Sequence, residues 1–150
     1  MNKEYMKKAI ELAKKSLKAD DVPVGAVVVR GGEIIGKGYN MREKLNDPTA
    51  HAEIIAIKEA AARLGSWHLD DCQIYVTLEP CPMCAGAIIN SRIKRVVFGA
   101  FEPKSGSCSL DSVVNLFNLP YNHTPEVYGG ILETDCAKLL KDFFEKRRGI

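Results

Sequence analysis

Residues 72–91, CQIYVTLEPCPMCAGAIINS, place a strand, a pair of cysteines and a helix in direct succession. The β-branched and aromatic run at 72–78 predicts a buried strand, and the apolar run at 82–91 predicts a helix. Cys81 and Cys84 stand at the junction, where their three-residue spacing lets one turn of backbone present both sulfurs to a single metal ion. The positive end of the helix favours the thiolate form of both side chains.

The chain on either side of this stretch alternates between strand and helix patterns. Residues 50–64, rich in alanine, isoleucine and glutamate, predict a helix that follows a turn and cap at 47–49 and carries His51 and Glu53 in its first turn. The other predicted elements are helices at 2–18, 113–118 and 134–148, two antiparallel strands at 24–29 and 33–39 joined by Gly31-Gly32, and a strand at 95–98. This alternation predicts a mixed α/β sheet with helices packed on it.

Length and composition limit the class of protein. At 150 residues and 46% hydrophobic residues, the chain suits one domain over residues 1–150. Five cysteines, an odd number, favour a reducing compartment, and we expect the cytoplasm. No apolar stretch approaches the roughly twenty residues that cross a bilayer, so no membrane partner is expected. A net charge of +2 is too small to indicate a nucleic acid, although Lys141, Lys146, Arg147 and Arg148 gather near the end of the chain and could contact phosphate.

His51 together with Cys81 and Cys84 predicts a reactive zinc site. A structural zinc is closed by four protein ligands, whereas a hydrolytic zinc keeps three and leaves the fourth position for water. Glu53 is then free to act on that water. Two other interpretations remain, a redox Cys-x-x-Cys pair and a closed site with a fourth ligand. The candidates for that fourth ligand are His68, Cys72, Cys108 and Cys136, and the three cysteines are otherwise expected to be small buried residues.

The motifs His51-Ala52-Glu53 and Pro80-Cys81-Pro82-Met83-Cys84 resemble the signature of the cytidine and deoxycytidylate deaminase superfamily. Along nearly its full length the chain is similar to one family within it, the bacterial tRNA-specific adenosine deaminases, at residues 22–27, 47–54, 75–81 and 96–100. The resemblance implies a three-layer α/β/α cytidine-deaminase-like fold with a central mixed sheet of about five strands and helices on both faces. It also implies a cytoplasmic homodimer, with one zinc ion per subunit, that converts the wobble adenosine of an arginine tRNA to inosine.

The chemistry implied by this resemblance is hydrolysis by a zinc-activated water. Glu53 takes a proton from the water and delivers it to N1 of adenine while the water oxygen attacks C6, and it then protonates the departing amine. The target base must leave its stack to reach a buried metal, so a loop such as that of the tRNA anticodon stem-loop is the favoured substrate.

The resemblance also implies substrate contacts. Asn40 matches an asparagine that hydrogen-bonds the flipped adenine, and an amide can read a purine edge; alternatively, Asn40 merely caps a turn. Of the paired aromatics Phe143 and Phe144, we expect one in the core and the other near RNA. The chain departs from the family at Glu102, where aspartate is usual, and in the loop at 105–111. The expected substrate-binding residues are Val24, Asn40, Ala52, Glu102, Lys104, Phe144, Arg147 and Arg148.

Two rival functions share part of these features. A guanine deaminase, or a cytosine or nucleoside deaminase, would use the same zinc chemistry without needing the basic C-terminal residues. A noncatalytic, zinc-stabilised RNA-binding module would need the metal but would leave Glu53 as an ordinary surface carboxylate. His68 and His123 have no motif around them and are assigned no role.

Overall fold

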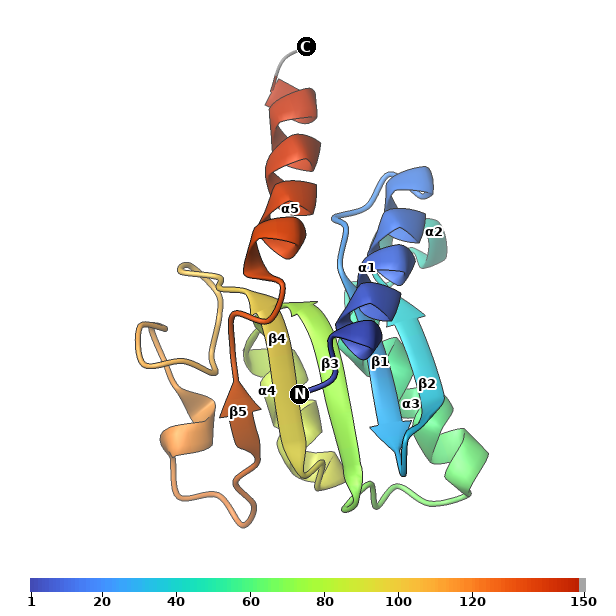
Figure 1. The fold of residues 1–150 in the computed structure, drawn as a ribbon, viewed down its shortest axis with the longest axis vertical. Helices are drawn as coiled ribbons and strands as arrows, with labels where there is room; N and C mark the ends of the chain where they lie inside the picture. The colour runs from blue at the N-terminus through green and yellow to red at the C-terminus, as the bar shows by residue number, and fades with distance from the viewer. Residues whose placement is uncertain (149–150) are drawn as a thin grey trace.

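A mixed five-stranded sheet forms the centre of the computed structural model, which describes residues 1–148 and the side chains of residues 1–147. Its strands lie in the order β2-β1-β3-β4-β5, as Figure 1 shows. β1 is antiparallel to both β2 and β3, whereas β3, β4 and β5 are mutually parallel. The carboxyl ends of β2, β3 and β4 therefore meet at one edge of the sheet, together with the start of β1. The strands are β1 (Gly25–Arg30), β2 (Glu33–Tyr39), β3 (Cys72–Leu78), β4 (Arg95–Ala100) and β5 (Glu126–Tyr128).

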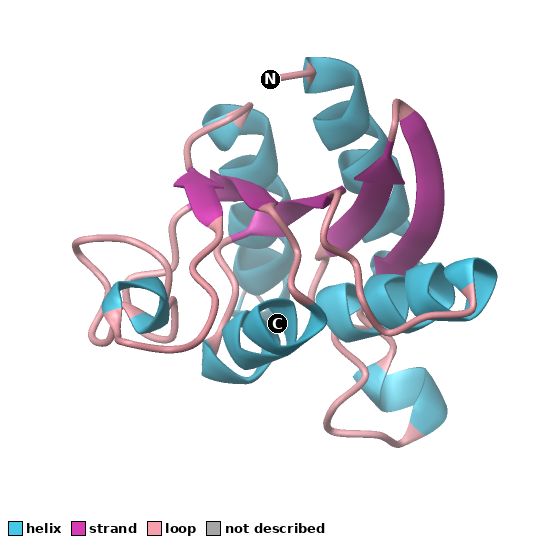
Figure 2. Ribbon diagram, turned by 90° about the horizontal axis from the view of Figure 1, so that it is seen from below, coloured by secondary structure: helices cyan, strands magenta, loops and turns pink. Residues whose placement is uncertain are grey.

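Helices cover both faces of the sheet (Figure 2). On one face lie α1 (Lys3–Lys18) and α5 (Glu133–Arg148), and on the other lie α3 (Ala52–Leu64) and α4 (Pro82–Ser91). Successive residues of a strand point to opposite faces, so Val27 packs in the cluster of α1 while Val28 packs in the cluster of α3 and α4. Each face thus buries a core of its own. The predicted mixed sheet with helices on both faces is confirmed.

Three short elements differ from the sequence predictions. The sequence patterns predict neither α2 (Arg42–Leu45) nor β5. β5 is only three residues long; it pairs with β4, and Glu126 forms an ion pair with Arg95 (2.9 Å). The helix predicted at 113–118 is a short 3-10 helix, η1 (Leu116–Asn118). Patterns over so few residues carry too little periodicity to decide the element.

The start of α3 also corrects the sequence prediction. The helix begins at Ala52, and Thr49 does not cap it, because both the backbone N–H and the hydroxyl of Thr49 donate to Asp47 Oδ1 (2.8 Å each) in the preceding turn. His51 is the N-cap and has extended backbone angles. Its side chain therefore leaves the chain just before the helix and not within the first turn.

Two glycines bring α3 directly onto β2. A Cβ atom on Gly38 would overlap with the carbonyl oxygen of Ala52, and a Cβ on Gly36 would overlap with that of Ala56. Only glycine permits this approach, because it lacks a Cβ. The first turn of α3 is thereby held against the last residues of β2, at the edge of the sheet where β3 and β4 also end.

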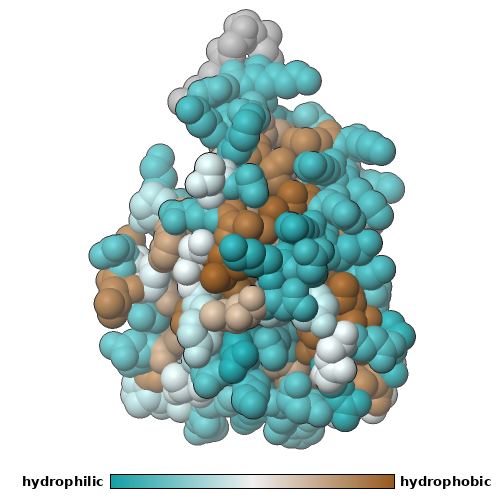
Figure 3. All heavy atoms as spheres, in the orientation of Figure 1, coloured by the Kyte–Doolittle hydropathy of each residue, from teal (hydrophilic) through white to brown (hydrophobic). Residues whose placement is uncertain are grey.

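The face that carries α1 and α5 is largely hydrophilic, with an apolar strip between the two helices (Figure 3). Leu17, Leu139 and Phe143 line a groove there, and Asp142 and Lys146 stand beside them. α5 continues past the edge of the sheet, so that its last turns lie beside the end of α1 (Figure 1). Within residues 1–148, every helix is too short or too polar to span a membrane.

Candidate functional site

Three side chains that are far apart in the sequence converge at the edge where β2 and β3 end. The Nδ1 atom of His51 lies 3.7 Å from the sulfur of Cys81 and 3.6 Å from the sulfur of Cys84. Within the described part of the chain, these three residues form the only group of His, Cys, Asp or Glu side chains that could hold a metal, and their ligand atoms all lie within 4.8 Å of one another. The structure therefore brings together the three residues expected from the motifs.

Both halves of this cluster are presented by the N-termini of helices. Cys81 is the N-cap of α4, Pro82 follows at the first helical position and Cys84 lies in the first turn. His51 is likewise the N-cap of α3. Neither N-cap residue makes a capping hydrogen bond with its side chain, and both side chains belong to the cluster instead. The positive ends of the two helix dipoles favour negative charge at this point.

The two thiols differ in acidity. Hydrogen bonds from Cys84 and His51 outweigh burial and lower the pKa of Cys81 to about 4. The same contact with Cys81, reinforced by burial, raises the pKa of Cys84. The contact with Cys81 also raises the pKa of His51. One thiolate thus forms readily, and the protons that remain on Cys84 and His51 are those that a bound cation would displace.

The spacing of the cluster suits a tetrahedral metal ion. An ion with metal–sulfur distances of about 2.3 Å and a metal–nitrogen distance of about 2.1 Å separates sulfur from nitrogen by about 3.6 Å. The two separations in the structure, 3.6 and 3.7 Å, match that value. Two thiolates and one imidazole are also ligands that zinc prefers. The residues present therefore fit a zinc ion with three protein ligands.

The candidates for a fourth ligand lie elsewhere in the described chain. None of Cys72, Cys108, Cys136 and His68 belongs to the metal-capable group of the described residues. All three cysteines are buried, and burial is the main cause that raises the pKa of each thiol. His68 is exposed and stacks on Trp67, and His123 Nε2 donates to the carbonyl oxygen of Ile93 (2.6 Å). The geometry therefore favours an open site over the closed one.

Glu53 shares a pocket with the cluster. Its side chain is 4% exposed, in the first turn of α3, and it lines a cavity of about 180 Å³ together with His51 and Cys81. Burial is the main cause that raises the pKa of Glu53 to about 7. A carboxyl group is thus placed beside the metal-capable cluster without belonging to it.

Asn40 both caps α3 and lines the pocket. Its Oδ1 atom accepts a hydrogen bond from the backbone N–H of Ala52 (2.9 Å), which replaces the missing side-chain cap of α3. Only the oxygen of the Asn40 amide can accept a hydrogen bond from this N–H. The orientation of the amide is therefore fixed, and the amino group Nδ2 points away from Ala52. The two interpretations of Asn40 from the sequence are thus compatible, because one amide oxygen serves the helix and the amino group remains a donor.

The other expected substrate residues fall into three places. Val24 and Glu102 line the pocket with Asn40, and Lys104 is exposed on the loop next to it. Ala52 is fully buried, with its N–H donated to Asn40. The remaining three belong to α5: Phe144 is 43% exposed, Arg147 binds Asp20, and the side chain of Arg148 lies outside the described residues.

The two aromatics of α5 differ in exposure. Phe143 is partly buried, lines the groove between α1 and α5, and lies under the Arg147 guanidinium (4.8 Å to the ring centroid). Phe144 is exposed and meets Phe143 edge-on. Phe143 is therefore the more enclosed of the pair and Phe144 the one on the surface.

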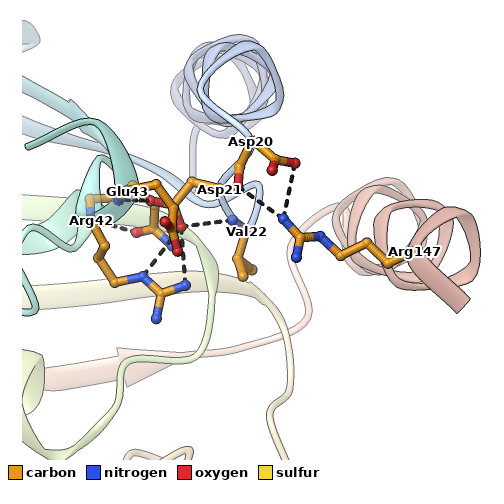
Figure 4. A network of polar contacts seen from close by, with 8 residues as sticks. Asp20, Asp21, Val22, Arg42, Glu43 and Arg147 are labelled. Carbon is orange, nitrogen blue, oxygen red and sulfur yellow. Dashed lines mark hydrogen bonds and ion pairs between the residues drawn. The ribbon is translucent and has the colours of Figure 1, made fainter. Parts of the chain in front are cut away.

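Sequence reasoning missed several residues of the pocket. Val22, Arg42, Leu78, Glu79 and Ser105 also line it. Figure 4 shows Arg42 held by Asp21, while Arg147 of α5 reaches Asp20 next to it. The one signal in the sequence is proximity, since Arg42 follows Asn40 by two residues and Glu79 precedes Cys81 by two.

Comparison with known proteins places this geometry among deaminases. The model of the MafB19-like deaminase family matches residues 1–148. A tRNA-specific adenosine deaminase of Bacillus subtilis is 50% identical over 145 residues, which cover 96% of this chain and 89% of that protein. A tRNA-specific adenosine deaminase of Aquifex aeolicus is 47% identical over 150 residues, which cover 99% of this chain and 97% of that protein.

Two solved structures show the same likeness. One, from a study of A-to-I editing by tRNA:A34 deaminases at the wobble position of transfer RNA, has a TM-score of 0.89 and 42% identity, and the match covers 93% of this chain and all of that one (100%). A guanine deaminase from Bacillus subtilis has a TM-score of 0.64 and 46% identity, and the match covers 67% of this chain and 66% of that one. The expected cytidine-deaminase-like α/β/α fold is confirmed.

Proposed function

The chain belongs to the tRNA-specific adenosine deaminase family, and on that premise we propose that it converts the wobble adenosine of a tRNA, that of an arginine tRNA foremost, to inosine. The reaction consumes one water and releases ammonia as the 6-amino group of adenine is replaced by oxygen. The observation that carries the proposal is the open His51–Cys81–Cys84 cluster with Glu53 in the same pocket. That combination supplies an electrophilic metal site and a proton carrier at one place.

We assign one zinc ion to each subunit, held by His51, Cys81 and Cys84. The support is the donor set and the sulfur–nitrogen separations of 3.6 and 3.7 Å. When bound, zinc activates water for attack at neutral pH. The N-cap positions of His51 and Cys81 place these two ligands on the ends of rigid helices, which favours a defined metal geometry.

Glu53 is the proposed proton carrier. In this role its carboxylate accepts a proton from the attacking water and donates it to N1 of adenine; it then takes the second proton from the new hydroxyl group on C6 and donates it to the departing amine, which leaves as ammonia. Its location supports the assignment, since the first turn of α3 places it two residues from His51 and inside the pocket. Burial of Glu53 excludes bulk water from competing for these protons.

Recognition of the base falls to side chains that line the pocket. The Nδ2 group of Asn40 is a fixed donor, because Ala52 occupies its oxygen, and it suits an acceptor nitrogen on the edge of a purine. Val24 supplies an apolar wall for the ring, and Glu102 stands on the opposite loop. A base can reach this pocket only after it leaves its stack, which favours an anticodon loop over a duplex.

Residues outside the pocket are the proposed contacts for the rest of the RNA. Lys104 lies next to the pocket, and Phe144, Arg147 and Arg148 belong to α5. Ala52 is buried behind Asn40. We propose that the anticodon stem-loop runs from the pocket toward α5, that the protein works as a homodimer, and that it does so in the cytoplasm. Light scattering during size-exclusion chromatography gives the oligomeric state, and a monomer would contradict that part of the proposal.

The test is direct incubation with substrates. The zinc-loaded protein is incubated with arginine tRNA carrying adenosine at the wobble position and, in parallel, with guanine, cytidine and free adenosine. Inosine in the tRNA, with no ammonia from the small substrates, supports the proposal. Ammonia from a small substrate alone would keep the zinc chemistry and overturn the tRNA as substrate.

Guanine deamination is the second candidate function. It is favoured by the 46% identity to the guanine deaminase of Bacillus subtilis, although that match covers 67% of this chain. The matches to tRNA-specific adenosine deaminases cover 96% and 99% of it. The region of likeness is thus more complete for the tRNA enzymes, and the guanine arm of the same assay decides between the two.

A further inference from the structure

Glu79 is a buried carboxylate whose partners all belong to one loop. It follows β3 and is 3% exposed. Its Oε1 atom accepts the backbone N–H of Glu102 (3.0 Å), while its Oε2 atom accepts the backbone N–H of Cys108 (3.0 Å) and the hydroxyl of Ser109 (3.0 Å). Such a group is costly to bury unless its oxygens are hydrogen-bonded. Residues 102–109, called here the rim loop, supply those hydrogen bonds.

The rim loop packs closely on Glu79 and on its neighbour Pro80. The backbone N–H and the hydroxyl of Ser107 both donate to the carbonyl oxygen of Pro80 (3.0 and 2.9 Å). A Cβ atom on Gly106 would overlap with the carboxyl group of Glu79 and with the carbonyl oxygen of Glu102. Gly106, Ser107 and Cys108 are all buried at this contact. The loop is therefore docked at both ends and in its middle.

This docking places the outer part of the rim loop at the pocket. Glu102 and Ser105 line the pocket, and Lys104 between them is exposed beside it. The N–H of Lys104 donates to the side chain of Glu102 (2.9 Å), which shapes the turn that carries all three. Residues 103–105 are exposed, so their position depends on the hydrogen bonds that dock the rest of the rim loop, those to Glu79 among them.

We propose that Glu79 is a positioning residue for the nucleic-acid substrate. By holding the rim loop, it places Glu102, Lys104 and Ser105 against the nucleotides that flank the target base. Both of its oxygens are committed to the loop, and it is outside the metal-capable cluster. Loss of the carboxylate therefore weakens substrate binding and leaves the chemical step intact. The inference rests on the proposed function in its choice of substrate.

Two variants undo the docking from opposite sides. Glu79→Gln replaces one acceptor oxygen with an NH₂ group, which then faces a backbone N–H and breaks at least one of the three hydrogen bonds. Gly106→Ala leaves Glu79 intact and pushes the loop away with a methyl group. The matched control is Ser112→Ala, which removes hydrogen bonds to the carbonyl oxygens of Ser109 and Val114, at and beyond the end of the rim loop, and leaves every hydrogen bond of Glu79 in place.

Steady-state kinetics on an anticodon stem-loop give the first readout. We expect KM to rise about tenfold in both test variants while kcat stays within about twofold, because the loss of a net hydrogen bond is of that size. Zinc content stays at the level of the unmodified protein, and Ser112→Ala changes neither constant. A fall in kcat at unchanged KM, or a loss of zinc, would overturn the proposal and would assign Glu79 to the chemistry or to the support of Cys81.

Limited trypsin digestion gives a readout that needs no activity. Lys104 is exposed in the rim loop, so cleavage after it becomes faster in Glu79→Gln and Gly106→Ala and stays unchanged in Ser112→Ala. Unchanged cleavage in both test variants would overturn the proposal even if the protein acts on a small substrate.

If Glu79→Gln fails to fold, Gly106→Ala and Ser109→Ala, which removes a single donor, carry the same test. Absence of tRNA deamination by the unmodified protein, with faster cleavage in the variants, would refute the proposed function and keep the docking.

Discussion

Asp21 holds Arg42 across the wall of the pocket. The Oδ1 atom of this buried carboxylate accepts from Nε and Nη2 of Arg42, at 3.2 and 3.0 Å, and from the backbone N–H of Val22 at 2.8 Å (Figure 4). Its Oδ2 atom accepts the N–H of Glu43 in α2 (3.1 Å). Val22 and Arg42 both line the pocket, so one carboxylate joins two of its walls.

The hydrogen bonds of Asp21 predict a stability that depends on pH. Burial alone would raise the pKa of Asp21, but the hydrogen bonds from Glu43, Arg42 and Val22 hold it below the usual 3.8. A carboxyl group whose pKa is lower in the folded protein than in the unfolded chain stabilises the fold at pH values above its unfolded pKa. That stabilisation is lost as the pH falls through its folded pKa. We therefore expect the free energy of unfolding to decrease below about pH 4.

Asp21→Asn tests this expectation. The variant should lose about 2 kcal/mol of unfolding free energy at neutral pH, and its stability should change less than that of the unmodified protein below about pH 4. Denaturant titrations at pH 7 and pH 3 give both numbers. The control is Asp71→Asn, which removes an exposed ion pair with Arg30 and should have little effect. Equal effects of the two variants would show that the buried network is not special.

Glu53→Gln should abolish deamination and retain zinc. The amide keeps the shape of the side chain but cannot accept and return a proton, a loss of about 10²-fold to 10⁴-fold in rate. Zinc content and thermal stability measure the metal site separately. Glu59→Gln, an exposed position on the same helix, serves as the control. Loss of zinc from a folded Glu53→Gln protein would instead make Glu53 a metal ligand.

The local motifs predict the central site because its parts are local. His51 and Glu53 are two residues apart, and Cys81 and Cys84 are three apart, so each pair is positioned by a single helix N-terminus that the sequence pattern shows. What sequence reasoning misplaced is the start of α3. Thr49 suits a cap by its chemistry, but Asn40, twelve residues before Ala52, supplies the capping oxygen. A cap from another segment is a tertiary contact that no local pattern contains.

The outer pocket depends on the sheet and could not be predicted from the sequence. Arg42 lines it only because Asp21, which precedes β1, holds the guanidinium. Glu79 and Ser105 both line it because β3 and β4 are parallel and end at the same edge, which brings the segment after one strand near the segment after the other. β5 was equally hidden, since its three residues gain their structure from pairing with β4.

Removal of the metal should be reversible and should depend on the three ligands alone. Dialysis against a chelator is expected to abolish activity and lower the unfolding temperature, and added zinc to restore both, because an ion that binds only the folded protein stabilises it. Cys84→Ser should bind no zinc, whereas Cys72→Ala, at a buried position outside the cluster, should bind it fully. Metal analysis of the purified variants measures this. Zinc loss in Cys72→Ala would reopen the question of a fourth ligand.

Removal of the last five residues tests the link between α5 and RNA. The deletion takes away Lys146, Arg147 and Arg148, so we expect weaker binding of the anticodon stem-loop. The dependence of the binding constant on salt should also become shallower, by about 0.7 to 0.9 in slope for each phosphate that the protein no longer neutralises.

Arg147 also binds Asp20, next to the pocket network, so Asp20→Asn serves as a control that breaks the ion pair and keeps the positive charges. If the deletion weakens RNA binding and Asp20→Asn does not, the charges act on the RNA itself. If both weaken it equally, α5 acts by supporting the turn at Asp20. Unchanged affinity in the deletion would make the basic end of α5 an ordinary solvated helix terminus, with zinc content confirming that the site is intact.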